Sequence, residues 1–400
     1  MKQTIKVFLS NQKKYLWFIV VRILSFLIIG FETFFGPKII GIDAYGIIEY
    51  EKQVISLSAI FLLGLHTGYS VQFYKSEKEQ GFGPFLFFGF MHILAVFLIY
   101  SFVTKTFSFG IMFFLFSILI EQILKIKNKF NLAILFKPLF SILLVAYYLY
   151  YYVSSNNIIS FIFDLNLIYS LAFIVFILIV LSHLLFKDKD KLKLDFKTYK
   201  QYLKEGFQPN LTSSLILVFF FIDRFLIEKY YGNFLGVYSV AYNFAVISFL
   251  VASSVGYVTT IKIGEKLNEF KELKKIVSKL INYSYLYIFF VLLFGGPVIF
   301  YLNKNWFMID GFEKIALINL TGRTFFGAAI FYTSVIYYKN KEYYSWSCLL
   351  FFILTILAID FYLIKNNIGD YMTIQYVSNI LLVIYAVFMN YVVRKKILIE

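Results

Sequence analysis

Long apolar runs separated by short polar loops divide the whole sequence. Twelve runs are 20 to 29 residues long, and about 20 mostly apolar residues are enough for a helix to cross a bilayer. Ile111–Ile120 is apolar at every position except Ser117, which excludes the alternating pattern of a membrane β-barrel. The sequence therefore predicts an all-α integral membrane protein with helices near residues 15–36, 49–73, 82–103, 107–126, 130–152, 158–186, 206–228, 233–261, 280–302, 312–338, 342–364 and 371–393.

The positive charge of the chain, +15 in total, is unevenly distributed between alternate loops. If the N-terminus is cytoplasmic, 27 of the 38 lysines and arginines fall in cytoplasmic segments, 7 fall on the opposite side and 4 lie within spans. Cytoplasmic loops of membrane proteins carry such an excess of basic residues. This pattern predicts that both termini are cytoplasmic, and it accounts for the charge without a nucleic-acid partner.

The spans divide into two sets of six. We expect an N-terminal lobe at 1–186, a cytoplasmic linker at 187–205 and a C-terminal lobe at 206–400. The second and eighth spans have similar sequences around Gly46 and Gly236, which are 190 residues apart. Two parallel six-helix bundles around a central cavity form a known transporter architecture. A chance match between two sequences of low diversity is the alternative explanation.

Recognisable catalytic chemistry is missing from the sequence. It has no nucleotide-binding G-x-x-x-x-G-K-[ST] loop and no zinc-binding H-E-x-x-H motif. The chain contains one cysteine and three histidines, and the histidines fall on different predicted helices. We therefore expect no catalytic residue, no metal site and no cofactor.

Four cations inside the spans are the most informative residues: Arg22, Lys137, Arg224 and Arg323. One such charge near the bilayer centre costs at least about 2.5–3.5 kcal/mol, so it usually faces a cavity or a partner. The four cations predict a cationic lumen that binds a multivalent anion such as a diphosphate, because the guanidinium fork matches phosphate oxygens.

Neighbouring polar residues support this prediction or offer internal partners for the cations. Ser25 shares a helix face with Arg22, and Asn319 shares one with Arg323. In the alternative interpretation the cations form internal ion pairs: Arg224 with Glu228, Arg22 with Glu121 or Asp164, and Lys137 with Glu121.

The loop at 262–279 has apolar residues at helical spacing among many lysines. This pattern predicts an amphipathic helix on the inner leaflet, with its lysines directed toward anionic lipids. A solvated helical extension is the other interpretation.

A specific pattern covers residues 202–245. It consists of a Gly-x-x-Pro entry, an apolar helix, an Asp-Arg pair, a short glycine-containing loop and then Leu-Gly-x-Tyr-Ser-x-Ala-Tyr. The matching residues are Gly206, Pro209, Asp223, Arg224, Gly232, Leu235, Gly236, Tyr238, Ser239, Ala241 and Tyr242. The stretch resembles polysaccharide exporters of the MOP superfamily, the Wzx-type flippases of O-antigen and capsule repeat units.

The resemblance implies a MATE-like fold and a location in the bacterial cytoplasmic membrane. It implies that the chain flips undecaprenyl-diphosphate-linked oligosaccharides by alternating access, with possible partners in a polysaccharide polymerase and a chain-length regulator and with possible coupling to H⁺ or Na⁺. Only Asp223 and Arg224 match the family pattern as charged residues.

Two other functions compete with the flippase. A multidrug and cation antiporter of the same superfamily would favour carboxylates in its cavity, but midspan acids are few, with Glu121 and Asp360 the clearest. A membrane-embedded polysaccharide polymerase or an envelope acyltransferase is the enzymatic alternative. A polymerase usually needs a substantial outer loop, and all the predicted outer loops are short.

Overall fold

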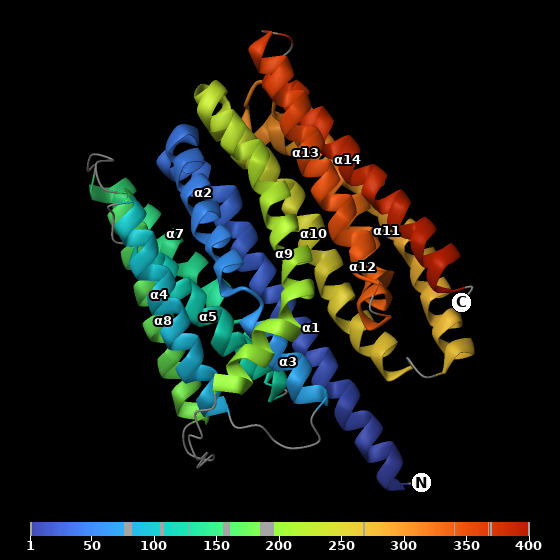
Figure 1. Cartoon of the computed structure of the whole chain (residues 1–400). Helices are drawn as coiled ribbons and strands as arrows, with labels where there is room; N and C mark the ends of the chain where they lie inside the picture. The colour runs from blue at the N-terminus through green and yellow to red at the C-terminus, as the bar shows by residue number, and fades with distance from the viewer. Residues whose placement is uncertain are drawn as a thin grey trace. The chain divides into compact units, whose positions relative to one another are not determined.

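The computed structural model describes residues 2–75, 82–104, 108–127, 129–154, 161–184, 196–266, 269–339, 341–366, 368 and 370–398. The regular structure in these ranges is helical throughout (Figure 1). The chain divides into two compact units. Unit 1 comprises Met1–Ile40 and Val54–Asn210, and unit 2 comprises Gly41–Gln53 and Leu211–Glu400.

Unit 1 contains the helices of the first half of the chain. Apolar sequences favour helices here because a helix satisfies its backbone hydrogen bonds internally, which a bilayer requires. The helices are α1 (Lys2–Ile40), the end of α2 (Ile42–Leu57), η1 (Ser58–Leu62), α3 (Leu65–Lys75), α4 (Phe82–Thr104), α5 (Phe109–Ile126), α6 (Phe130–Ala133), α7 (Phe136–Ser154), α8 (Phe161–Leu184) and the start of α9 (Phe196–Tyr231).

The second span is broken between η1 and α3. The two parts are bent by 49°, and Gly64 at the break has a φ of 85°, a conformation that glycine adopts without steric cost. A Cβ built on Gly64 would lie 2.3 Å from the carbonyl oxygen of Gly206 on α9. The break therefore brings two backbones into direct contact, and only glycine fits there.

Unit 2 contains the remaining helices, together with the first turns of α2. Asp370 caps the start of the last α-helix, because its carboxylate accepts hydrogen bonds from the backbone N–H groups of Met372 (2.9 Å) and Thr373 (3.3 Å). The helices are the end of α9, η2 (Gly232–Phe234), α10 (Leu235–Glu265), α11 (Phe270–Leu302), η3 (Asn303–Phe307), α12 (Phe312–Tyr338), α13 (Tyr343–Lys365), α14 (Tyr371–Val392) and η4 (Val393–Ile397).

The twelve predicted spans all coincide with helical segments. In the described residues, nine stretches are long and apolar enough to cross a membrane, and the bent α2–α3 pair adds a tenth. One of the nine, Phe196–Gly256, contains both α9 and α10, and α8 is helical where the sixth span is expected. The protein is thus a multi-pass membrane protein, as the hydropathy pattern predicts.

Helix α12 forms the centre of unit 2. It packs against α10, α11 and α14, and 72% of its most apolar window is buried, against 6% for α11. Side chains on α12 are therefore surrounded by protein, whereas α11 is exposed along most of its length.

The two glycines aligned by the predicted repeat contact each other within unit 2. A Cβ built on Gly46 of α2 would lie 2.7 Å from the Cα of Gly236 on α10. A Cβ built on Gly236 would lie 2.5 Å from the carbonyl oxygen of Ile42. The first turns of α2 and α10 therefore approach as closely as two backbones can.

Two sequence expectations differ from the structure. Residues 41–53 cluster with the second half of the chain, and 196–205 of the expected linker belong to α9, while 185–195 lie outside the described residues. No separate amphipathic helix spans 262–279: α10 continues to Glu265 and α11 begins at Phe270. Leu273 and Val277, expected on the lipid side, are buried in protein. The solvated helical extension therefore describes this segment better.

Candidate functional site

Two of the four predicted cations, Arg224 on α9 and Arg323 on α12, lie together in unit 2. Each is only 2% exposed, and the ring of Tyr242 on α10 links them. Its centroid is 4.3 Å from the Cζ of Arg224 and 4.4 Å from the Cζ of Arg323. The structure thus brings two positive charges into contact with one aromatic ring.

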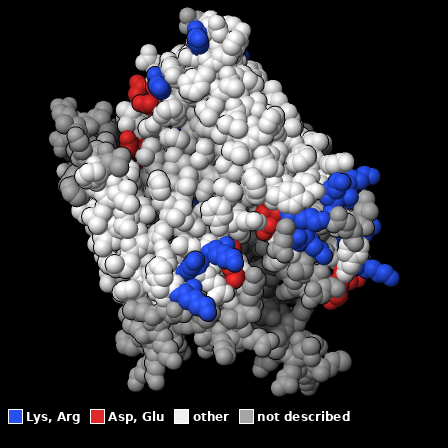
Figure 2. All heavy atoms as spheres, viewed as in Figure 1, with Lys and Arg blue, Asp and Glu red and all other residues white. Residues whose placement is uncertain are grey.

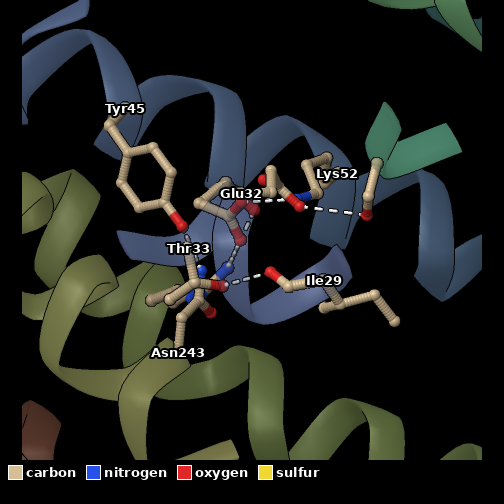
Figure 3. Close-up of polar contacts among 9 residues, drawn as sticks. Ile29, Glu32, Thr33, Tyr45, Lys52 and Asn243 are labelled. Carbon is tan, nitrogen blue, oxygen red and sulfur yellow. Dashed lines mark hydrogen bonds and ion pairs between the residues drawn. The ribbon is translucent and has the colours of Figure 1, made fainter. Parts of the chain in front are cut away.

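Arg224 is held by hydrogen bonds within the protein. Its Nη1 donates to the backbone carbonyl of Glu49 (2.8 Å) and lies 3.8 Å from the Glu49 carboxylate. Its Nη2 donates to Oδ1 of Asn243 (2.9 Å), whose amide donates to the hydroxyl of Tyr45 (2.9 Å; Figure 3). Arg224 therefore connects α9 to α2 and α10, and most of its fork is occupied.

Arg323 is held differently, by aromatic rings. Its Cζ lies 3.5 Å from the centroid of Phe220. A guanidinium over a desolvated ring gains about 2 kcal/mol or more, but the ring accepts no conventional hydrogen bond from its edge. In the described part of the chain, Nε and Nη1 of Arg323 have no hydrogen-bond partner. Arg323 therefore has two buried donors to offer to a ligand, whereas Arg224 has one, its Nε.

A pocket of about 450 Å³ lies close to Arg323 in unit 2. Phe326 lines it and packs on Phe220 with a centroid distance of 5.3 Å, so two rings separate the pocket from the guanidinium. The lining is aromatic and rich in hydroxyl groups, and its described residues include no carboxylate. They are Ile216, Thr260, Phe326, Ala329, Ile330, Thr333, Ser334, Tyr337, Tyr338 and Tyr385.

A second polar cluster joins α9, α12, α13 and α14. Ser378 donates to the carboxylate of Asp223 (2.7 Å), and the Asn319 amide donates to Gln375 (3.0 Å). Asp360 on α13 is fully buried, and neither of its carboxylate oxygens has a hydrogen-bond partner within the described ranges. Oδ1 of Asp223 also lacks a hydrogen-bond partner in the described part of the chain.

The other two predicted cations lie in unit 1. Arg22 is half-buried with its Cζ 5.0 Å from the Phe26 ring centroid, and the Glu121 charge acts on both Arg22 and Lys137. Glu121 itself pairs with Lys125 at 3.5 Å. Glu121 is thus ion-paired with Lys125, and the association of Arg22 and Lys137 with Glu121 stays a prediction. The side chain of Asp164 lies outside the description.

Polar residues of α1 form hydrogen bonds within their own helix or to the neighbouring helix α7. The Ser25 hydroxyl donates to the carbonyl of Val21 (2.8 Å), and Thr33 donates to that of Ile29 (3.1 Å; Figure 3). Glu32 accepts a hydrogen bond from Ser141 on α7 (3.2 Å). Ser25, a predicted supporting residue, therefore uses its hydroxyl within its own helix.

The partners of Arg224 differ from the one that the sequence suggested. The alternative interpretation pairs Arg224 with Glu228, but Glu228 is exposed and Arg224 contacts Glu49 and Asn243 instead. Asn243, like Gln375 and Ser378, is a polar residue in the middle of an apolar run. The sequence alone therefore marks these residues as unusual, although it does not identify which helices contact each other.

No protein-family model matches the sequence, and no curated protein sequence matches it. Solved structures do match. An inward-facing multidrug-resistance MATE transporter of the MOP superfamily superposes with a TM-score of 0.62 at 14% identity, covering 94% of both chains. The chain has the MATE fold. This result confirms the fold class predicted from the hydropathy pattern and from residues 202–245.

Other MATE structures give the same result. A MATE protein in its straight conformation has a TM-score of 0.58 at 14% identity, covering 95% of this chain and 94% of that one. A Vibrio cholerae MATE transporter has a TM-score of 0.54 at 13% identity, with 96% and 95% covered. These matched proteins are transporters and not enzymes, and their low identity to the present chain establishes the shared fold alone.

Proposed function

We propose that this protein is a MOP-superfamily transporter that flips undecaprenyl-diphosphate-linked oligosaccharide repeat units across the cytoplasmic membrane, for surface polysaccharide synthesis. The observation that carries the proposal is Arg323, a buried guanidinium with two nitrogens lacking partners among the described residues. A buried donor without a partner costs about 1–3 kcal/mol. A phosphate oxygen that reached it would recover that free energy and form a strong charge-assisted bond.

The adjacent pocket suits the sugar part of such a substrate. Its tyrosine, serine and threonine hydroxyls can exchange hydrogen bonds with a glycan, and its aromatic rings offer flat apolar surfaces. The rings of Phe220 and Phe326 stand between the pocket and Arg323. A rotation of these two rings during the transport cycle would connect the sugar and diphosphate subsites.

A multidrug and cation antiporter is the second candidate. A cationic drug requires negative charge to offset its desolvation, and no carboxylate occurs among the described residues that line the pocket. Asp223 and Asp360, which have carboxylate oxygens without a hydrogen-bond partner among the described residues, do not line the pocket. The lack of a carboxylate in the described lining, together with the nearby Arg323, therefore favours an anionic substrate.

The function is tested with purified protein in proteoliposomes. Flippase activity predicts that the protein transfers an undecaprenyl-diphosphate-linked oligosaccharide between leaflets, measured by access of an external glycosidase to the sugar. Protein-free liposomes, and liposomes with Arg323→Ala protein, serve as controls. Efflux of a cationic dye such as ethidium, without any transfer of the lipid-linked sugar, would instead support the antiporter.

Coupling to a cation is a further part of the proposal, with Asp223 and Asp360 as its site. Burial disfavours the charged form of a carboxylate, and three of the four carboxylate oxygens of Asp223 and Asp360 have no hydrogen-bond partner among the described residues. One proton or one Na⁺ ion bound there lowers the cost of burial. The amides of Asn319 and Gln375 and the hydroxyl of Ser378 lie in the same cluster. They provide neutral oxygen ligands for the ion.

Asp360→Asn should abolish ion coupling, because the asparagine side chain has no negative charge to attract a proton or a Na⁺ ion. We expect either an imposed Na⁺ gradient or an imposed pH gradient to accelerate flipping by the wild-type protein in proteoliposomes. The same gradient should not accelerate the variant. The exposed Asp310→Asn variant provides the matched control. Equal acceleration of Asp360→Asn and wild type, or no response of the wild type to either gradient, would contradict the coupling site.

A further inference from the structure

A groove on unit 2 separates α11 from α14. Ser284, Tyr285 and Ile288 of α11 form one wall, and Ala386, Val387, Asn390 and Tyr391 of α14 form the other, while α12 provides the floor. The groove has a volume of about 300 Å³. It exists because α11 and α14 both pack on α12 and leave a space between their exposed faces.

The groove continues along α11 in one direction. A second depression of about 510 Å³ shares Tyr285, Ile288 and Phe325 with it and extends to Leu293. From Ser284 to Leu293 the helix rises about 14 Å. Apart from Tyr285, the walls of this extension are aliphatic or phenylalanine side chains. The groove is therefore long, narrow and apolar over most of its length.

The other end of the groove is basic. Arg394 and Lys395 of η4 line it, and both side chains are exposed. Nearby, the Asn390 amide donates to the Tyr285 hydroxyl (3.2 Å), which leaves that hydroxyl free to donate onward. Figure 2 shows basic side chains gathered near the C-terminus of the chain, at the end of α14 (Figure 1).

We propose that this groove is a specific binding site for an anionic glycerophospholipid. Arg394 and Lys395 contact the phosphate, Tyr285 and Asn390 contact the polar groups next to it, and one acyl chain lies in the apolar part along α11. Basic pockets between transmembrane helices at a membrane surface bind anionic lipid headgroups. The order of the groups, from cation to hydroxyl to apolar wall, follows the order of the parts of a phospholipid.

The basic end and the apolar end of the groove lie where the headgroup and the acyl chain of a bilayer lipid would lie. The groove lies on the part of the protein that faces lipid, since α11 is the least buried of the candidate spans. Its basic end is at the end of a span and its apolar end runs toward the middle. A zwitterionic lipid also fits the apolar part, but it carries no net charge to match the two cations. The site is distinct from the lysines at the start of α11, which do not line the groove.

The test uses full-length protein in a neutral detergent, titrated with lipid while its thermal unfolding is followed. Dioleoyl-phosphatidylglycerol should raise the unfolding temperature with saturation, and dioleoyl-phosphatidylcholine should raise it much less. Arg394→Gln with Lys395→Gln should weaken the phosphatidylglycerol response about ten- to thirty-fold in half-saturating concentration. Val387→Trp fills the groove from an exposed position and should abolish saturation without removing any charge.

The matched control is Lys274→Gln with Lys275→Gln. It makes the same change in net charge at exposed positions on α11, outside the groove, and it should respond like the wild type. An equal loss in this control would show diffuse charge attraction and overturn the site. An equal response of wild type to both lipids would also overturn it. Displacement of phosphatidylglycerol by undecaprenyl phosphate at much lower concentration would assign the groove to a polyprenyl chain instead.

Discussion

Arg323→Ala is expected to abolish export of lipid-linked oligosaccharide while the protein remains inserted at its normal level. Arg323 has two guanidinium nitrogens without a partner among the described residues, and one hydrogen bond to a charged group contributes about 1.5–3 kcal/mol. The expected loss of flipping rate is therefore about ten- to a hundred-fold or more. The glycosidase-access assay in proteoliposomes measures this loss directly, and surface polysaccharide on cells that express the variant provides an independent measurement.

Arg323→Lys separates charge from geometry. A lysine keeps the positive charge but has no planar fork to bind two phosphate oxygens or to stack on Phe220, so we expect intermediate activity. Lys365→Ala removes one cation from an exposed position and should leave the rate unchanged. Wild-type flipping by Arg323→Ala, in protein with an unaltered unfolding temperature, would refute the role of this residue in diphosphate binding.

Glu49→Ala is expected to cause the largest loss of stability. Its carbonyl and carboxylate both contact Arg224, and its carboxylate also accepts a hydrogen bond from Lys52 (2.5 Å). Removal of one partner from a buried ion pair typically costs about 3–5 kcal/mol, because it leaves the other charge uncompensated. The measurement is the midpoint of thermal or denaturant-induced unfolding of the purified protein in detergent.

Two comparisons identify the cause of that loss. Glu228→Ala removes the acid that the sequence paired with Arg224, but Glu228 is exposed, so we expect a change of about 0–1 kcal/mol. The double variant Glu49→Ala with Arg224→Met should be more stable than Glu49→Ala alone, because no buried charge is then left unpaired. If the double variant is less stable by the sum of the single effects, the ion pair does not account for the loss.

The order of spans could be predicted from sequence, and the contacts between them could not. Hydropathy depends on each residue alone, so all twelve apolar runs were placed on helices. Arg323 and Asn319 were recognised because a polar group in an apolar run is costly wherever the helix packs. The partners of Arg224 depend instead on where α2 and α10 lie, and a single sequence contains no direct record of that placement.

The ends of the helices show a second limit. The sequence suggested an amphipathic helix at 262–279, but three of its apolar residues, Ile263 in α10 and Leu273 and Val277 in α11, are buried against protein. A helix stripe that packs on lipid and one that packs on protein have the same apolar spacing. The pattern correctly predicted which side of the helix is apolar, but it could not distinguish the two partners.

The contact between Gly46 and Gly236 has a consequence for how such a chain can change in evolution. Equivalent residues of two identical subunits meet each other only on a two-fold axis, where one mutation alters both sides of the contact at once. In an ancestor of two identical six-helix subunits, any side chain at this position would have met its own copy. The single chain holds the two positions separately, so a larger residue on one helix can be accommodated by a change on the other.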